Sequence, residues 1–212
     1  MKHPVNQKLV DYVEKNVIPL YDSFDKAHRR DHALAVIGRA LELSSYYDVD
    51  CDIVYAAAAC HDIGLSAGRD IHHLESGKLI RANDVLKELL GADGVELAAQ
   101  AAEDHRASAD HEPRSIYGRI IAEADRQIEP LTVIRRTVQY GLGHYPELDK
   151  EAHWERTQAH LKEKYDYGGY LKLWIPESPN AAKLEELRKM IADKSLLRSL
   201  FEKIWEEETN KK

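Results

Sequence analysis

The sequence predicts an all-α fold, and three observations support this prediction. Apolar residues recur at helical spacing along nearly the whole chain. No clear alternation typical of a β-strand occurs in the first 140 residues. Residues that begin or end helices stand where these apolar patterns start and stop, among them Asp31, Gly91 and the pair Ser178-Pro179.

The expected helices follow one another with short connections. The first covers about 9–21, and the second runs from about Asp31 to Tyr46. The third begins at Asp50 or Asp52, carries the apolar run 53–60 and stops at Gly64. Because this run has almost no polar face, we expect it to be the central, buried helix. Further helices are expected at about 71–90, 94–104, 115–127 and from Pro130 onward.

The composition changes near Gly141, where tyrosines, tryptophans and glycines become frequent up to residue 176. This aromatic stretch could be a lid that stacks on a nucleobase, or a packing seam that docks the last helix or forms a homodimer contact, and we favour packing. Its end, 167–174, could be a short hairpin or a packed loop. A final amphipathic helix with a break near Asp193 follows. We therefore predict a helical core at 1–130 and a helical extension at 131–212 packed on it.

Composition and charge narrow the function. The 212 residues contain 43% hydrophobic and 32% charged residues, an ordinary globular mixture. A net charge of −7 argues against binding to extended nucleic acid. No apolar stretch is long enough for a membrane span, and the residues after Met1 do not resemble a signal peptide. Cys51 and Cys60 are too few for a disulfide framework, so a cytoplasmic location is expected.

The chemically most informative residues are His61 and Asp62, which end the buried helix in the sequence Cys60-His61-Asp62-Ile63-Gly64. Burying an imidazole beside a carboxylate is costly unless a partner pairs with both. A divalent metal ion does so, because both groups are metal ligands. Neighbouring residues on a helix diverge by about 100°, so the two converge most easily at a helix end.

Two more candidate ligands lie far away in the sequence. His32 stands near the start of the second expected helix, among apolar residues. Asp125 lies on the apolar face of a later helix, with Ile121 four residues before it and Ile128 three after it. A carboxylate on such a face needs a cation, although each residue could instead be a core polar group with satisfied hydrogen bonds.

Together these residues give the pattern H…HD…D, and over about residues 25–130 the chain resembles the HD-domain superfamily of metal-dependent phosphohydrolases. His61-Asp62-Ile63-Gly64 matches the HDIG variant of its signature, His32 matches the first histidine and Asp125 the last aspartate. The resemblance implies a helical bundle around one or two divalent ions, of Mn, Fe, Co, Ni, Zn or Mg. It also implies hydrolysis of phosphate esters, for which nucleotides are the substrate class.

A subgroup of the family has two further histidines, in the pattern H…HD…H…H…D. His73 and His105 fall where these would stand, and they would hold a second metal or bind phosphate. His72 competes with His73, and spacing does not separate them; we prefer His73 for its context His-x-Glu-x-Gly. In a two-metal site Asp62 would bridge the ions, and a bridging water would attack phosphorus.

Other residues are candidates for handling the substrate. Among several arginines near the expected ligands, most of them ordinary surface charges, Arg106 is the best candidate for binding phosphate because it adjoins His105. His28 could line the pocket. Glu75 and Asp104 are candidates for the general acid, although both could be surface acids.

We therefore predict a metal-dependent phosphohydrolase that cleaves a phosphate ester or anhydride with a metal-activated water. Two alternatives stay open at this point. The same ligands serve relatives that use two irons and dioxygen to oxidise a substrate. A catalytically inactive domain that senses a nucleotide or assembles with a partner is the other alternative, and the intact ligand set argues against it.

Overall fold

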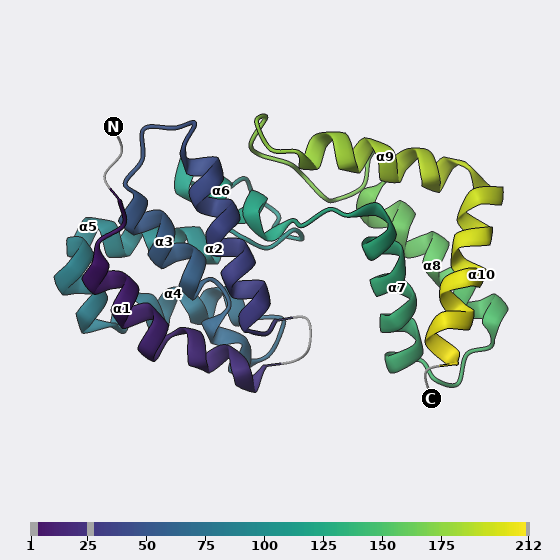
Figure 1. Cartoon of the computed structure of the whole chain (residues 1–212), viewed down its shortest axis with the longest axis horizontal. Coiled ribbons are helices and arrows are strands. Elements are labelled where there is room, and N and C mark those ends of the chain that lie inside the picture. Colours follow the sequence, from purple (N-terminus) through teal and green to yellow (C-terminus); the bar gives the residue numbers. More distant parts are fainter. Residues whose placement is uncertain (1–3, 25–27, 211–212) are drawn as a thin grey trace. The chain divides into compact units, whose positions relative to one another are not determined.

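The computed structural model describes residues 4–24 and 28–210. Residues 1–3, on which the expected absence of a signal peptide partly rests, lie outside the described residues. So do 25–27, the first residues of the stretch that carries the family resemblance, and 211–212. All regular structure in the described part is helical, with no strand (Figure 1). The all-α prediction is therefore confirmed.

Ten α-helices and two short 3-10 helices make up the described chain (Figure 1). In chain order they are α1 (Gln7–Asn16), η1 (Ile18–Ser23), α2 (Arg30–Ser44), α3 (Cys51–Cys60), η2 (Ile63–Ala67), α4 (His72–Ala82), α5 (Asp84–Glu103), α6 (Ile116–Asp125), α7 (Pro130–His144), α8 (Lys150–Tyr165), α9 (Asn180–Ala192) and α10 (Lys194–Thr209).

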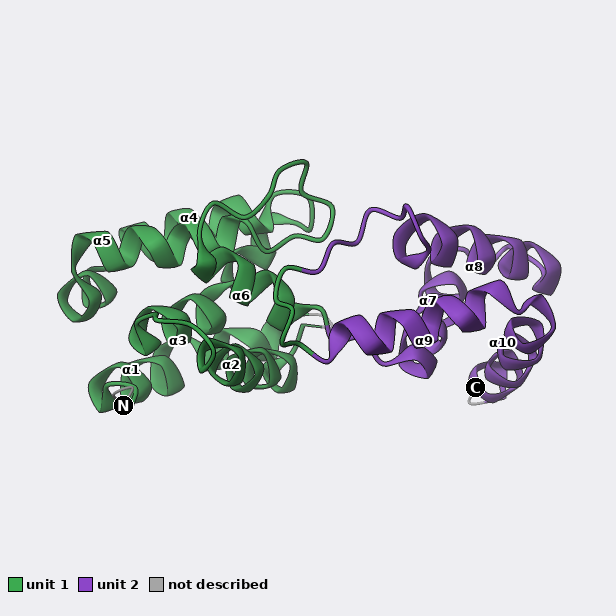
Figure 2. Cartoon of the chain, turned by 90° about the horizontal axis from the view of Figure 1, so that it is seen from above, with its two compact units in different colours: residues 1–126, 174–178 green, residues 127–173, 179–212 purple. Residues whose placement is uncertain are grey.

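The chain folds into two compact units, coloured separately in Figure 2. The first comprises the residues up to 126 together with 174–178, and the second comprises 127–173 and the residues from 179 onward. The sequence predicts the division after residue 130, and it gives no indication that residues 174–178 belong to the first unit. That the extension packs on the core stays a prediction.

The first unit is built around α3. Every residue from Ile53 to Cys60 is buried, and α3 packs against α1, α2, α5 and α6. The nearly unbroken apolar run explains this central position, since a helix without a polar face is stable only where other helices cover it on all sides. As a result, His61 and Asp62, which follow Cys60 directly, lie inside the first unit.

The helix boundaries differ from the expected ones in two places. The helix expected at about 71–90 is divided into α4 and α5 by Asn83, whose side chain accepts a hydrogen bond from the backbone N–H of Leu86 at 3.0 Å. Gly91, expected to end that helix, does interrupt the helical backbone with a φ of 71°, although α5 continues on both sides of this kink. α3 ends at Cys60 and not at Gly64.

Residues 174–178, which we call the strap, belong to the first unit although they follow α8 in the chain. The Ile175 side chain is buried in the core that α3 organises. The backbone N–H of Trp174 donates to Glu123 Oε2 at 2.7 Å, and the Tyr47 hydroxyl donates to Glu177 Oε2 at 2.6 Å. The neighbouring segment 167–173 contains no strand, so it is a loop and not a hairpin.

The second unit is an assembly of α7, α8, α9 and α10, in which α7 packs against the other three. Its core includes Ile134, Leu161, Leu187 and Phe201. The helix break expected near Asp193 is present, because the Asp193 side chain caps α10 by accepting from the backbone N–H of Leu196 at 2.9 Å. None of the helices in the described parts of the chain combines the length and the apolar character needed to cross a membrane.

Candidate metal centre

His61 and Asp62 lie at the buried end of α3. His61 keeps helical backbone angles, with φ −59° and ψ −33°, whereas Asp62 leaves the helix with φ −113° and ψ 5°. Because the backbone changes direction between them, the two side chains turn to the same side, and His61 Nε2 lies 3.2 Å from Asp62 Oδ2. Both residues are buried.

A first group forms where two other helices approach this turn. His32, in the first turn of α2, places its Nε2 3.3 Å from His61 Nε2 and 3.6 Å from Asp62 Oδ2. Asp125, the last residue of α6, places its Oδ1 3.3 Å from His32 Nε2. The structure thus brings together the four residues of the H…HD…D pattern, although they span nearly a hundred positions.

A second group forms on the other oxygen of Asp62. Asp62 Oδ1 lies 3.3 Å from His72 Nε2 and 3.4 Å from His105 Nε2, and these two nitrogens are 3.2 Å apart. His72 opens α4, and His105 follows the end of α5. Asp62 therefore belongs to two ligand groups at once, His32–His61–Asp62 and Asp62–His72–His105.

Three of the histidines are oriented by the same contact. The Nδ1 atoms of His61, His72 and His105 lie 2.6–2.7 Å from the carbonyl oxygens of Ala58, Arg69 and Ala102, each three residues earlier. A carbonyl oxygen can only accept, so Nδ1 carries the proton and donates it. In the neutral ring the lone pair is then on Nε2, which faces Asp62. Such contacts fix the orientation of histidines that bind metals.

This donor set fits one or two divalent ions. In the neutral rings the lone pairs of His72 Nε2 and His105 Nε2 converge with no proton between them, and the buried Asp62 Oδ1 has no hydrogen-bond partner among the described residues. Two lone pairs and a carboxylate oxygen facing one point repel each other unless a cation lies there. Imidazole nitrogen and carboxylate oxygen are ligands suited to first-row divalent metals.

The pKa values of the cluster show the same need for positive charge. Burial alone would lower the pKa of His32, but the carboxylates of Asp125 and Asp62 outweigh it and raise the pKa to about 10. Burial would raise the pKa of Asp62, yet the adjacent imidazoles hold that pKa well below its usual range. Without a metal ion, a proton on an imidazole is the cation that compensates these carboxylates.

The expectation that His73, in preference to His72, faces the site is wrong. His72 is in the second group, whereas His73 is in neither group. Consecutive residues on a helix point about 100° apart, so only one of the two can face Asp62. The His73 ring packs against the His72 ring, with centroids 5.6 Å apart. Burial, and next the charge of Arg106, lower the pKa of His73 to about 4, so this ring is neutral at pH 7. His105 is placed as expected.

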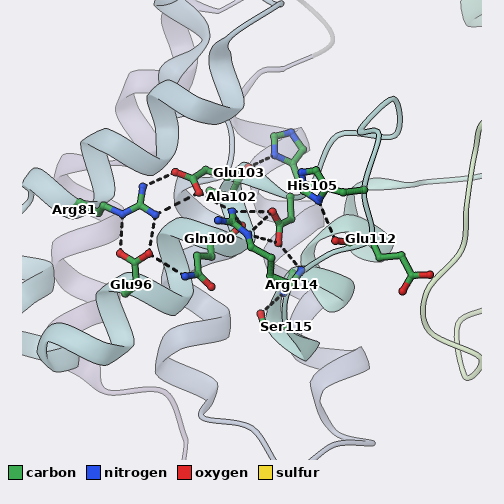
Figure 3. A network of polar contacts seen from close by, with 12 residues as sticks. Arg81, Glu96, Gln100, Ala102, Glu103, His105, Glu112, Arg114 and Ser115 are labelled. Carbon is green, nitrogen blue, oxygen red and sulfur yellow. Dashed lines mark hydrogen bonds and ion pairs between the residues drawn. The ribbon is translucent and has the colours of Figure 1, made fainter.

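The two candidate general acids are engaged elsewhere. The Asp104 carboxylate accepts from the backbone N–H of Arg114 at 2.7 Å and from its Nε at 2.9 Å. Arg114 also binds Glu103, which contacts Arg81, and Arg81 pairs with Glu96 through two nitrogens (Figure 3). This charge network joins α4, α5 and the segment before α6, so Asp104 anchors the fold and lacks the free carboxyl that a general acid needs. Glu75 pairs with Lys78 at 3.0 Å.

The two expected substrate-binding residues lie at the edge of the cluster. The His28 ring packs edge-on against His32, with centroids 5.7 Å apart, and Arg69 NH2 lies 3.4 Å from His28 Nδ1. Arg106 NH1 donates to the backbone carbonyl of Asp70 at 2.7 Å. His28 therefore lies beside His32, and Arg106 is bonded to the turn that precedes His72.

Two residues support the cluster in ways that the sequence did not indicate. The Tyr21 hydroxyl donates to the carbonyl of Ala59 at 2.8 Å and accepts from the backbone N–H of Asp62 at 3.4 Å, so it steadies the turn at the end of α3. Gly64 packs against the first turn of α4, where its N–H donates to Ser76 Oγ at 2.9 Å. The sequence places Tyr21 only at the end of the first expected helix, and nothing in the neighbouring residues distinguishes it from an ordinary core tyrosine.

Comparison with family models gives a match to the model described as the HD domain, over residues 29–127. Residues 29–127 are an HD domain. Its matched stretch contains both ligand groups, and this buried set of histidines and aspartates is consistent with the metal site of HD domains. No match was found among curated proteins or among solved structures. The HD family consists mostly of metal-dependent phosphohydrolases. The helices beyond residue 127 lie outside the matched stretch.

Proposed function

We propose that this HD-domain protein is a metal-dependent phosphohydrolase with a two-ion centre. One observation carries the proposal: Asp62 presents one carboxylate oxygen to His32 and His61 and the other to His72 and His105. A carboxylate divided in this way between two groups of nitrogen ligands suits a bridge between two ions. Asp125 would complete the first group.

When bound, a pair of divalent ions supplies a water of lowered pKa and neutralises charge on a phosphate. The protein's own residues would hold everything else in place. The Nδ1–H groups of His61, His72 and His105 keep these rings oriented, and the buried position of Asp62 limits access of bulk water. Arg69 and His28 at the edge would bind the negatively charged substrate.

A small phosphorylated compound, and in particular a nucleotide, is the proposed substrate class. Its basis is the resemblance to the family, to which the geometry adds only that positively charged side chains adjoin the centre. Cleavage would release phosphate, or a phosphorylated fragment, from an ester or anhydride. With Asp104 held by Arg114 and Glu75 paired with Lys78, protonation of the leaving group would fall to water, or to Glu75 once it leaves that ion pair.

The test is hydrolysis by metal-free protein loaded separately with Mn²⁺, Co²⁺, Fe²⁺, Ni²⁺, Zn²⁺ or Mg²⁺. Nucleoside monophosphates, nucleoside triphosphates, cyclic nucleotides and guanosine tetraphosphate serve as substrates, and release of phosphate or nucleoside is measured. We expect turnover with at least one ion, lost in Asp62→Asn and retained in the control His144→Ala on α7. Absence of turnover throughout would contradict the proposal.

Two further measurements distinguish the alternatives. Protein purified without added metal that contains two irons and consumes oxygen with a substrate would favour the oxygenase. Tight nucleotide binding without turnover, at full metal occupancy, would favour a sensing or assembly module.

A further inference from the structure

The turn formed by residues 68–71, between η2 and α4, connects the two sides of the second ligand group. Gly68 begins it with a φ of 100°, a conformation that favours glycine. The carbonyl of Arg69 accepts the Nδ1 proton of His72, and the carbonyl of Asp70 accepts from Arg106, the residue after His105. One short turn is therefore hydrogen-bonded to His72 and to the neighbour of His105.

The histidines of the cluster differ in what holds them. His61 and His105 are oriented by the carbonyls of Ala58 and Ala102, which lie inside the helices α3 and α5. His72 is oriented by the carbonyl of Arg69, which lies outside any helix. A carbonyl in a turn is less firmly held than one in a helix. His72 thus depends on whatever fixes the turn.

We propose that Arg106 is the positioning residue that fixes this turn and thereby sets the affinity of the second ligand group for its metal ion. Its hydrogen bond to the Asp70 carbonyl ties the turn that orients His72 to the segment that carries His105. The two Nε2 atoms are only 3.2 Å apart, so a small displacement of the turn would separate them. This inference rests on the metal centre of the proposed function, but not on hydrolysis.

The contact itself separates this role from phosphate binding. Arg106 donates to a backbone carbonyl, so changing the Asp70 side chain leaves the acceptor in place, whereas changing Arg106 removes the donor. A lysine at 106 can still donate one hydrogen bond to a carbonyl, but it lacks the fork with which arginine binds a phosphate in two places.

The experiment is a titration of the metal-free full chain with Mn²⁺, in which the affinities of the first and second ion are measured by calorimetry, with no substrate present. In Arg106→Gln we expect the second ion to bind about 10–100-fold more weakly, the usual effect of losing a residue that orients a ligand. The first ion should keep its wild-type affinity. Asp70→Asn is the matched control and should bind both ions normally, and Arg106→Lys should recover most of the loss.

Other results would overturn the proposal. Wild-type affinity for the second ion in Arg106→Gln would do so, as would an equal loss of both ions or a wild type that binds a single ion. If Arg106→Gln binds both ions normally but inorganic phosphate more weakly, Arg106 is a phosphate ligand and not a positioning residue. Two tight ions without hydrolysis of any nucleotide would contradict the phosphohydrolase proposal alone.

Discussion

Gly64 lies so close to His72 that a Cβ atom on Gly64 would overlap the His72 carbonyl oxygen and come within 2.5 Å of the Ser76 nitrogen. Both are backbone atoms of the first turns of α4, so they cannot give way by a change of rotamer. Gly64 has no positive φ. It is therefore required by close packing and not, as the sequence suggested, by the ending of a helix.

The first prediction is that Gly64→Ala destabilises the protein by about 1–3 kcal/mol, the usual cost of an overpacked core. Urea unfolding of the metal-free chain measures this. Gly38→Ala in α2 is the control, since a Cβ atom at Gly38 would meet nothing within 4 Å apart from the local backbone of α2. It should be neutral, or stabilise by up to about 1 kcal/mol. Equal unfolding midpoints for Gly64→Ala and wild type would show that α4 accommodates the methyl group.

The second prediction concerns the adjacent histidines. His72→Ala should lower the metal content from two ions per chain to one, because it removes a nitrogen 3.3 Å from Asp62 Oδ1. His73→Ala is the matched control and should retain two ions, since His73 is in neither ligand group. Elemental analysis after metal loading and removal of free metal measures both. Loss of an ion in His73→Ala, with none in His72→Ala, would restore the assignment made from sequence context.

Some residues of the metal centre could be predicted from the sequence, and others could not. His61 and Asp62 were identifiable because they interrupt an apolar run, and Asp125 because it lies on an apolar helix face. The choice between His72 and His73 depends on how α4 is rotated about its axis, and this depends on how α4 packs against η2, which includes Gly64, and against α5. The engagement of Asp104 by Arg114 links residues ten positions apart across a loop with no repeating pattern.

The strap was not predictable for a similar reason. Its five residues have no periodicity, and the contacts that hold Ile175 in the core, from Trp174 to Glu123 and from Tyr47 to Glu177, join residues 51 and 130 positions apart. The break at Asn83, in contrast, had a readable signal: an asparagine followed by an acidic residue and then apolar positions is a typical helix start. The apolar pattern continues across Asn83, however, and therefore favours a single helix over 71–90.

The third prediction is an acid dependence of stability that involves Glu96 on α5. Hydrogen bonds from Arg81 lower the pKa of Glu96 to about 2 from an ordinary 4.5. Because the folded pKa is the lower one, the ion pair contributes stability above about pH 4.5, and this contribution disappears as the pH falls toward 2. The Glu96 side chain is 47% exposed, so the contribution is below about 1 kcal/mol.

Glu96→Gln should therefore be slightly less stable than wild type at pH 7, and this difference should shrink between pH 4.5 and pH 2. Urea midpoints of the metal-free proteins at several pH values measure it, since bound metal would itself dissociate in acid. A difference that stays constant with pH would mean that the pair with Arg81 does not determine the ionisation of Glu96.

The last prediction is that the strap is part of the folding unit of the HD domain. Ile175 is buried in the core around α3, although the HD match ends at residue 127. Truncation of this side chain should cost about 2–5 kcal/mol in Ile175→Ala and about 0.5–1.5 kcal/mol in Ile175→Val, in proportion to the volume removed. Both changes should weaken the first unit without weakening the second, whose core contains Ile134 and Phe201.

The three tryptophans make this measurable, because Trp174 is in the first unit while Trp154 and Trp205 are in the second. In a Trp154→Phe/Trp205→Phe background, urea unfolding followed by fluorescence reports on the first unit alone. In a Trp174→Phe background it reports on the second. Leu196→Ala, on an exposed side of α10, is the control and should change neither transition strongly. If Ile175→Ala left the Trp174 transition unchanged, the HD domain would be stable without the strap, and residues 174–178 would be a connection and not a part of its core.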